Sequence, residues 1–251
     1  MKLLFLFLFV LITFSSSAQA LSTAHKKAIM QFVSHVKKGE VEQLAEKVSY
    51  PLSRSYPLPD IKNQAQFIKR YREVFDGELV KQISQSDVNN DWSLVGWRGL
   101  MFNNGDVWLD EDGNLTTVNY ESAAEKQLRK ELIAEDKRSI HASLRQFESP
   151  MCVMETTTYR IRIDYMGDGN YRYASWKKTQ PMSAQPDLIL TKGECFTEGT
   201  GGNHRYVFKN GEYVYTCSII VMGEGEQPPA TLEVHKNRKQ ILFHKVVNLN
   251  N

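Results

Sequence analysis

"GTGGNHRYVFKNGEYVYTC", residues 199–217, is the stretch that decides the fold of the C-terminal half of this chain. Two aromatic runs flank Asn210-Gly211, and both residues of this pair accept the positive φ that a tight two-residue turn requires. The pattern predicts an antiparallel hairpin with the cross-strand pairs Lys209–Glu212, Phe208–Tyr213, Tyr206–Tyr215 and His204–Cys217. The hairpin then has one aromatic face, which is either core or a contact platform for a partner.

Two functional interpretations of this stretch are weighed against a structural one. A histidine opposite a cysteine is the arrangement that a thiolate nucleophile and its base require. The sequence identifies no third group that would orient the histidine, so we interpret the pair of His204 and Cys217 as structural. The glycines precede a strand, whereas a dinucleotide-binding loop opens a helix whose N-terminus holds the phosphates. We therefore predict a loop between two strands at residues 199–202.

The remainder of the C-terminal half has the alternation of β-strands. Tyr159, Ile161, Ile163 and Tyr165 alternate with charged residues, which predicts a strand with one buried and one solvent-exposed face. Short strands of this kind, separated by turns rich in Gly, Asn and Asp, are typical of an antiparallel barrel or sandwich. We predict such a domain over residues 148–251, with the linker at Glu148–Pro150.

The N-terminal half has a helical period first and a strand period afterwards. Ser22 is a suitable N-cap for an amphipathic helix that ends at Gly39, and Asn63 is a second N-cap. Asn104-Gly105 is a hairpin signal that sets Phe102 opposite Val107. Residues 21–147 are therefore predicted to form an α+β domain, a curved antiparallel sheet covered by helices.

Residues 1–20 have the features of a signal peptide. Lys2 precedes an apolar run at residues 3–14, and Ala18-Gln19-Ala20 is a small-x-small cleavage site. The apolar run is shorter than the ~20 residues that span a membrane. We therefore expect an exported chain, periplasmic or secreted, with no membrane association after cleavage.

Composition narrows the classes of partner. The net charge is +2, and no block of Lys and Arg forms the footprint of a nucleic-acid-binding protein. The three cysteines Cys152, Cys195 and Cys217 are disulfide candidates in an oxidising compartment, with the pairing left open. We predict no cofactor and no metal site, and the oligomeric state is not predicted.

Aromatic residues of the N-terminal half are the candidates for a ligand site. An apolar pocket with a few polar groups is the usual composition of a small-molecule site. A helix-covered sheet with an aromatic core is the alternative that the same residues allow. The candidate pocket residues are Tyr50, Tyr71, Asp91, Trp92, Trp97, Arg98, Trp108 and Asn119. The candidate partner contacts are Tyr206, Phe208, Tyr213 and Tyr215.

Both halves resemble known families. The order of helices and hairpins resembles the cone-shaped NTF2/SnoaL-like fold. The stretches "YPLP", "IKN", "FIKRY" and "WRGLMFNNGDVWLDEDG" are similar to N-terminal domains of uncharacterised exported bacterial proteins. The C-terminal half is weakly similar to the small periplasmic β-barrel inhibitors of c-type lysozyme, although residues 201–206 lack the serine of their inhibitory loop and differ in spacing. The NTF2-like resemblance implies either an enzyme or a binding module.

These features lead to one principal functional hypothesis and two alternatives. We expect an exported, non-enzymatic protein that binds a small ligand or a protein partner, because the sequence contains aromatic surfaces and no recognisable catalytic constellation. The first alternative is an isomerase or hydrolase that uses the aromatic pocket of the N-terminal domain. The second is lysozyme inhibition by the C-terminal domain.

Overall fold

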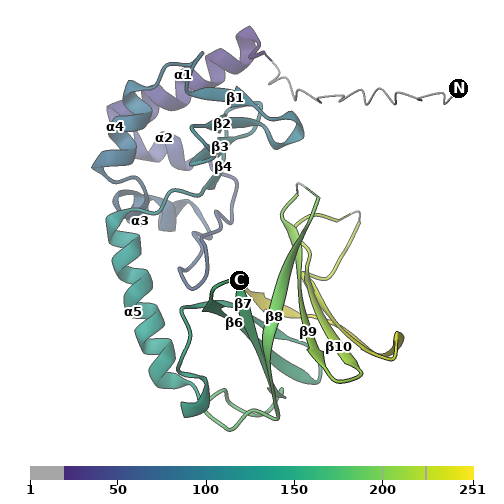
Figure 1. Cartoon of the computed structure of the whole chain (residues 1–251). Coiled ribbons are helices and arrows are strands. Elements are labelled where there is room, and N and C mark those ends of the chain that lie inside the picture. The colour runs from purple at the N-terminus through teal and green to yellow at the C-terminus, as the bar shows by residue number, and fades with distance from the viewer. Residues whose placement is uncertain (1–19, 200, 224) are drawn as a thin grey trace, which may run out of the picture. The chain divides into compact units, whose positions relative to one another are not determined.

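The computed structural model describes residues 20–199, 201–223 and 225–251, and the predicted signal peptide lies outside this range except for Ala20. The fold is α+β (Figure 1). It consists of two compact units, the first made of the described residues up to Tyr50 together with Gly77–Tyr120, and the second of Pro51–Asp76 and Glu121–Asn251. The predicted domain boundary after residue 147 falls inside the second unit.

The first unit contains three helices and a four-stranded antiparallel sheet of order β1-β2-β3-β4. Its elements are α1 (Thr23–Lys38), α2 (Val41–Ala45), α4 (Gly77–Gln85), β1 (Trp92–Leu94), the 3-10 turn η1 (Gly96–Arg98), β2 (Leu100–Phe102), β3 (Val107–Leu109) and β4 (Leu115–Val118). The predicted ends of α1 are confirmed, because Ser22 Oγ accepts a hydrogen bond from the His25 amide at 3.1 Å and Gly39 has a φ of 68°. These are the two residue types that such helix ends favour.

The small sheet buries one face and has its predicted register. Phe102 lies opposite Val107, as expected from the Asn104-Gly105 signal. The ring of Phe32 on α1 packs edge-on against Trp92, with centroids 6.0 Å apart. The buried residues of the four strands are Trp92, Leu94, Leu100, Phe102, Val107, Leu109, Leu115 and Val118. This side of the sheet is therefore an aromatic core beneath α1.

The second unit contains two helices and a nine-stranded antiparallel sheet that curls (Figure 1). The sheet order is β12-β11-β10-β9-β8-β7-β6-β5-β13. The elements are α3 (Gln64–Val74), α5 (Ala123–Ser139), the 3-10 turn η2 (Ala142–Leu144), β5 (Ser149–Glu155), β6 (Tyr159–Gly167), β7 (Asn170–Lys177), β8 (Leu188–Glu198), β9 (Asn203–Asn210), β10 (Tyr213–Ile219), β11 (Ala230–Lys236), β12 (Lys239–Lys245) and β13 (Asn248–Asn250). None of the described helices is long and apolar enough to cross a membrane.

The predicted register of the β9–β10 hairpin is wrong. Asn210 pairs with Tyr213, so the two turn residues are Gly211 and Glu212. Gly211 has a φ of 58°, whereas Asn210 and Glu212 do not have a positive φ. This is the pattern of a two-residue turn that needs glycine at its first central position. As a result Tyr206, and not His204, lies opposite Cys217.

The aromatic residues of this hairpin point into the curled sheet. Tyr206 and Phe208 are buried, and Tyr213 and Tyr215 are half-buried. The Phe208 ring covers Gly193 so closely that a Cβ there would lie 2.1 Å from a ring carbon. Of the two alternatives left open by the sequence, Tyr206 and Phe208 therefore belong to the core. The buried core residues are Cys152, Met154, Ile161, Ile163, Tyr173, Leu190, Tyr206, Phe208, Cys217, Ile219, Ala230, Leu232 and Val246.

The outer face of β6 is buried, which corrects the prediction of a solvent-exposed face. The Arg162 and Asp164 side chains are 0% exposed. Beside them, a second apolar cluster connects the segment after α5 with the sheet, and its buried members are Ile140, Leu144, Phe147, Ala174 and Trp176. The alternation of apolar and charged residues correctly predicts a strand here, but the structure covers both faces of that strand.

An ion-pair network occupies this covered face. Asp164 accepts hydrogen bonds from Arg162 at 2.7 Å and from Arg172 at 2.6 Å. Arg162 also donates to both carboxylate oxygens of Asp136 on α5, at 2.9 and 2.6 Å. Burial alone would lower the pKa of Arg162, but its hydrogen bonds to Asp136 and the charge of Asp164 raise it above the ordinary value. The ion pair between Arg162 and Asp136 therefore links β6 of the sheet to α5.

The predicted linker at Glu148–Pro150 is also wrong, because Ser149 and Pro150 begin β5. The β5–β6 ladder is irregular between Pro150 and Cys152. A proline is tolerated at a bulge near a strand start, where its missing N–H breaks no regular ladder bond.

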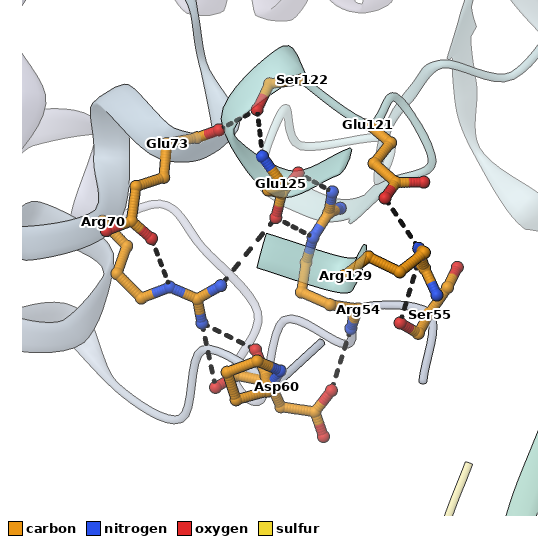
Figure 2. A network of polar contacts seen from close by, with 10 residues as sticks. Arg54, Ser55, Asp60, Arg70, Glu73, Glu121, Ser122, Glu125 and Arg129 are labelled. Atoms are coloured by element: carbon orange, nitrogen blue, oxygen red, sulfur yellow. Dashed lines mark hydrogen bonds and ion pairs between the residues drawn. The ribbon is translucent and has the colours of Figure 1, made fainter. Parts of the chain in front are cut away.

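A second buried network joins the start of α5 to residues 51–76 (Figure 2). Glu125 in the first turn of α5 is fully buried and accepts a hydrogen bond from Arg54 Nε at 2.9 Å. Arg54 Nη2 pairs with the other carboxylate oxygen of Glu125. Arg70 Nη2 lies 3.9 Å from Glu125, and the Ser122 hydroxyl donates to the Glu73 carbonyl. The first turn of α5 is thus held by charge as well as by its Ser122 cap.

Candidate functional site

A groove on the concave side of the curled sheet is the candidate site. Its volume is about 310 Å³, and it lies where strands that are distant in sequence meet. The lining residues are Tyr159, Tyr173, Ser175, Asp187, Leu188, Tyr213, Tyr215, Leu232, Val234, Ile241 and Leu242. Four phenol rings, five aliphatic side chains and two further polar side chains thus surround one hollow.

The tyrosines are packed against one another and against the core. The ring centroids of Tyr173 and Tyr215 are 5.8 Å apart, and those of Tyr173 and Phe208 are 5.6 Å apart. Burial raises the pKa of Tyr173 and of Tyr215 above their ordinary value. A tyrosine phenol is neutral at pH 7 even at its ordinary pKa, so both groups are able to donate or accept hydrogen bonds.

Two polar side chains of the groove already form hydrogen bonds within the protein. Asp187 accepts a hydrogen bond from the Lys177 amide at 3.1 Å. Ser175 is hydrogen-bonded to Tyr173. The groove therefore presents mainly neutral aromatic and aliphatic surface, with hydroxyl groups at defined places.

Basic residues concentrate at the end of the sheet where this groove lies. The antiparallel order brings the β7–β8, β9–β10 and β11–β12 connections to the same end. These connections carry the basic residues Lys177, Lys178, Lys209, Lys236, Arg238 and Lys239, of which all except the half-buried Lys178 are exposed. Glu212 is on the same rim and lies 3.8 Å from Lys236. The Lys236 ammonium lies 5.2 Å from the ring centroid of Tyr213, which connects the rim to the groove.

A second hollow of about 610 Å³ lies toward the other end of the sheet. It is lined by Ser55, Tyr56, Arg129, Ser149, Pro150, Met151, Tyr165, Gly169, Tyr171, His204, Tyr206 and Asn251. Arg129 is engaged by Glu121 at 2.7 Å and by two backbone carbonyls. This hollow is more polar than the groove, and its most prominent charged group is already paired.

The pocket residues predicted for the N-terminal half fall in both units, and those of the first unit do not form one cluster. Trp92 is buried and donates its indole N–H to Ser86 at 3.0 Å, whereas the Trp97 side chain is 62% exposed. Tyr50 donates its hydroxyl to the Ala45 carbonyl at 2.9 Å, and burial raises its pKa to about 12. Tyr71 belongs to the second unit, where it stacks on Phe75 and burial also raises its pKa to about 12.

The structure does bring three of these residues together. Trp108 and Asn119 donate to the same carbonyl, that of Gly105, at 3.0 and 2.8 Å. The Arg98 guanidinium lies 5.1 Å from the Trp108 ring centroid. Asp91 is not part of this group, because its carboxylate accepts from the Asp87 amide at 2.7 Å and it lines a polar hollow of about 340 Å³. The candidate residues Asp91 and Arg98 therefore have different surroundings, Asp91 in this polar hollow and Arg98 beside the Trp108 ring.

The three cysteines are free thiols within the second unit. Cys195 and Cys217 lie opposite Tyr206 on its two sides, so two strand spacings of ~4.8 Å separate their backbones. A disulfide requires Cα atoms within ~7 Å, which excludes the pair Cys195–Cys217. Burial raises the pKa of Cys152 to about 12 and that of Cys217 well above its usual value. In the part of the chain that the structure describes, no three His, Cys, Asp or Glu side chains gather as a metal site.

The thiols are therefore expected to differ in reactivity. At pH 8, Ellman's reagent should modify only the partly exposed Cys195 in the native protein, and slowly, because burial raises its pKa as well. All three should react in guanidinium chloride without prior reduction. A Cys195→Ser variant should abolish the native reaction, and a count below three in denaturant would contradict the free-thiol state.

Sequence reasoning missed most of the groove. Tyr213 and Tyr215 were proposed as partner contacts, but Tyr159, Tyr173 and Ser175 were not proposed as site residues. A partial signal is present in the tyrosine pairs of "YRY" and "YVY", but only Tyr173 of the first pair lines the groove, whereas Tyr171 lines the second hollow. Comparison with known proteins adds no assignment, because no family model, curated protein or solved structure matches this chain.

Proposed function

We propose that this chain is an exported, non-enzymatic binding protein whose ligand occupies the tyrosine-lined groove of the curled sheet. The observation that carries the proposal is the convergence of four tyrosines on a hollow of about 310 Å³. Aromatic and aliphatic walls with a few fixed polar groups are typical of a binding site.

The chemistry of the lining favours binding over catalysis. Among the described residues, the lining contains one carboxylate, that of Asp187, and no histidine, cysteine or lysine that would act beside it as a general acid, base or nucleophile. A phenol is neutral at pH 7 even at its ordinary pKa, and burial raises the pKa of Tyr173 and Tyr215 further, so both rings suit hydrogen bonding and ring stacking.

The finer fold assignment is part of the same proposal. A four-stranded sheet with helix α1 against its buried face supports an NTF2-like first domain. A nine-stranded sheet with a continuous inner core supports a barrel-like second domain. In this proposal Trp92 and Phe102 belong to the core of the first domain, and the ligand binds to the second domain.

The dye anilinonaphthalene sulfonate, which fluoresces in apolar pockets, tests the site. We expect Tyr215→Ala to weaken dye binding about tenfold, because one lost aromatic contact of about 1.4 kcal/mol corresponds to that factor. Tyr165→Ala is the matched control, since Tyr165 is a half-buried tyrosine of the same sheet that lines the other hollow. Dye binding that responds to Tyr165→Ala and not to Tyr215→Ala, or that is absent from the folded protein, would overturn the proposal.

A further inference from the structure

We propose that the natural occupant of the tyrosine groove is an extended, acidic polypeptide segment of a partner protein, which adds as a strand beside β12. This inference rests on the proposed binding function of the groove and specifies its ligand. It is carried by three features of the same end of the sheet: a free strand edge, the apolar groove beside it and the basic rim.

β12 is a terminal strand of the described sheet. Its ladder joins it to β11, and no described strand pairs with its other edge. The chain leaves this edge after residue 245, because the Val246 amide bonds to the Ala230 carbonyl at 2.9 Å and the Val247 amide to the Glu155 carbonyl at 2.7 Å. The last residues therefore pass from β12 to β5, where β13 pairs with residues 153–155, and no described strand covers the outer edge of β12. A free edge is a template for one more strand.

The groove lies directly beside this edge. Ile241 and Leu242 of β12 are part of its lining, and Ile241 is 53% exposed. Successive side chains of a strand point to opposite faces, so every second residue of an added strand would face the concave side. An apolar or aromatic side chain of the partner would then lie among Tyr159, Tyr173 and Tyr215, where the phenols give hydrogen bonds at the edge of the hollow.

The rim determines the charge of the partner. Arg238 and Lys239 lie on this rim at the start of β12, and Lys245 lies at the other end of the same strand. All three are exposed, and none has an ion pair among the described salt bridges. Acidic residues on the outward-facing positions of an added strand would lie close to these cations, and opposite charges across a ladder stabilise it.

The same lysines disfavour a second copy of this chain. Two β12 strands paired antiparallel about Leu242 would bring Lys239 of each copy opposite Lys245 of the other. Like charges directly opposite one another destabilise a ladder, and edge lysines are a usual protection against self-association. The lysines therefore repel a second β12 strand, but they attract a strand that carries acidic residues.

The test uses the full mature chain and the acetylated, amidated peptide Glu-Val-Glu-Tyr-Glu-Val-Glu. We expect the peptide to displace anilinonaphthalene sulfonate from the groove and to bind in calorimetry, and its Lys-for-Glu analogue to bind at least about tenfold more weakly. Two further peptides carry N-methyl groups on alternate residues. In the first peptide the methyl groups block the N–H groups of one strand edge, and in the second they block those of the opposite edge. Only one of the two should lose binding, because a strand pairs with β12 through one edge.

Charge reversal in the protein provides the matched comparison. Arg238→Glu with Lys239→Glu should weaken peptide binding about tenfold and lessen its salt dependence. Lys37→Glu with Lys38→Glu, exposed lysines of α1 in the other unit, changes the net charge equally and should leave binding unchanged.

The outcomes separate this inference from the function on which it rests. Groove binding of the dye without any binding of the acidic peptide overturns the peptide assignment and leaves the groove function standing. Loss of both overturns both. Equal binding of the two N-methylated peptides overturns strand addition. Self-association in sedimentation that Arg238→Glu with Lys239→Glu alters identifies a second copy as the occupant and overturns the inference as well.

Discussion

Replacement of Asp164 by alanine is expected to lower the free energy of unfolding by about 3–5 kcal/mol. Asp164 is fully buried on β6 and accepts hydrogen bonds from Arg162 and Arg172. The substitution leaves two guanidinium groups, 0% and 5% exposed, without their shared carboxylate. Urea unfolding followed by circular dichroism measures the loss. Glu194→Ala, an exposed acidic residue of the same sheet, should change stability by no more than about 0.5 kcal/mol.

A second variant separates the buried charge from the packing around it. Replacing Arg162 and Arg172 by methionine together with Asp164→Leu removes all three charges and keeps the volume similar. Buried ion clusters replaced in this way often lose little stability, because the desolvation of the ions is removed with their attraction. A triple variant as unstable as Asp164→Ala would show that the loss comes from packing, and a cost below about 1 kcal/mol for Asp164→Ala would contradict the buried network.

Local signals were sufficient for the local structure. Caps at Ser22 and Asn63 are properties of a few neighbouring residues, and the structure confirms both of them. The register expected from Asn104-Gly105 is also confirmed, but the turn spans residues 103–106 and its positive φ angles are at Asn103 and Gly105. The register of the hairpin at Gly211 is harder to predict, because the sequence fits two turns. In one turn Asn210 and Gly211 are the two central residues, and in the other the turn is shifted by one residue and Gly211 is the first central residue. The sequence offers both registers, and the packing of Tyr206 opposite Cys217 in the core accompanies the second.

The covered face of β6 was not predictable from its own alternation. Charged residues at every second position normally indicate solvent, and the pairing of Asp164 with Arg172 becomes visible only when the β6–β7 register is known. Asp136, the partner on α5, is 26 residues from Arg162 in the sequence. The missed feature is thus a long-range contact between charges, which composition and periodicity do not report.

The groove was missed for a related reason. Tyr159 and Tyr215 belong to strands β6 and β10, which are far apart in the sheet order and meet on one hollow because the sheet curls. The aromatic ladder of the hairpin was recognised from sequence, but whether it faces core, groove or solvent depends on the curvature. Curvature arises from twist and bulges accumulated over many strands, which no single stretch encodes.

Replacement of Glu125 by alanine is the second change expected to cost about 3–5 kcal/mol. Glu125 is fully buried, and its carboxylate neutralises Arg54, whose side chain is 3% exposed, with Arg70 at 3.9 Å. Without it, two positive charges remain next to each other at the helix N-terminus, which already carries a positive partial charge. Hydrogen exchange should show the opening of α5 and residues 51–76 (Figure 2).

The matched control for this variant is Glu135→Ala, an exposed glutamate on the same helix. Glu125→Gln keeps the side-chain shape and one acceptor, so it should be nearly as destabilising as alanine if charge, and not hydrogen-bond geometry, is what Arg54 requires. A loss with alanine that is no larger than for Glu135→Ala would contradict the buried pair. A loss with alanine but not with glutamine would assign the stabilisation to hydrogen bonding. If Glu125→Ala costs no more than Glu135→Ala, the start of α5 is held chiefly by the Ser122 cap and by packing, and Ser122→Ala is then expected to be the most destabilising change in the first turn.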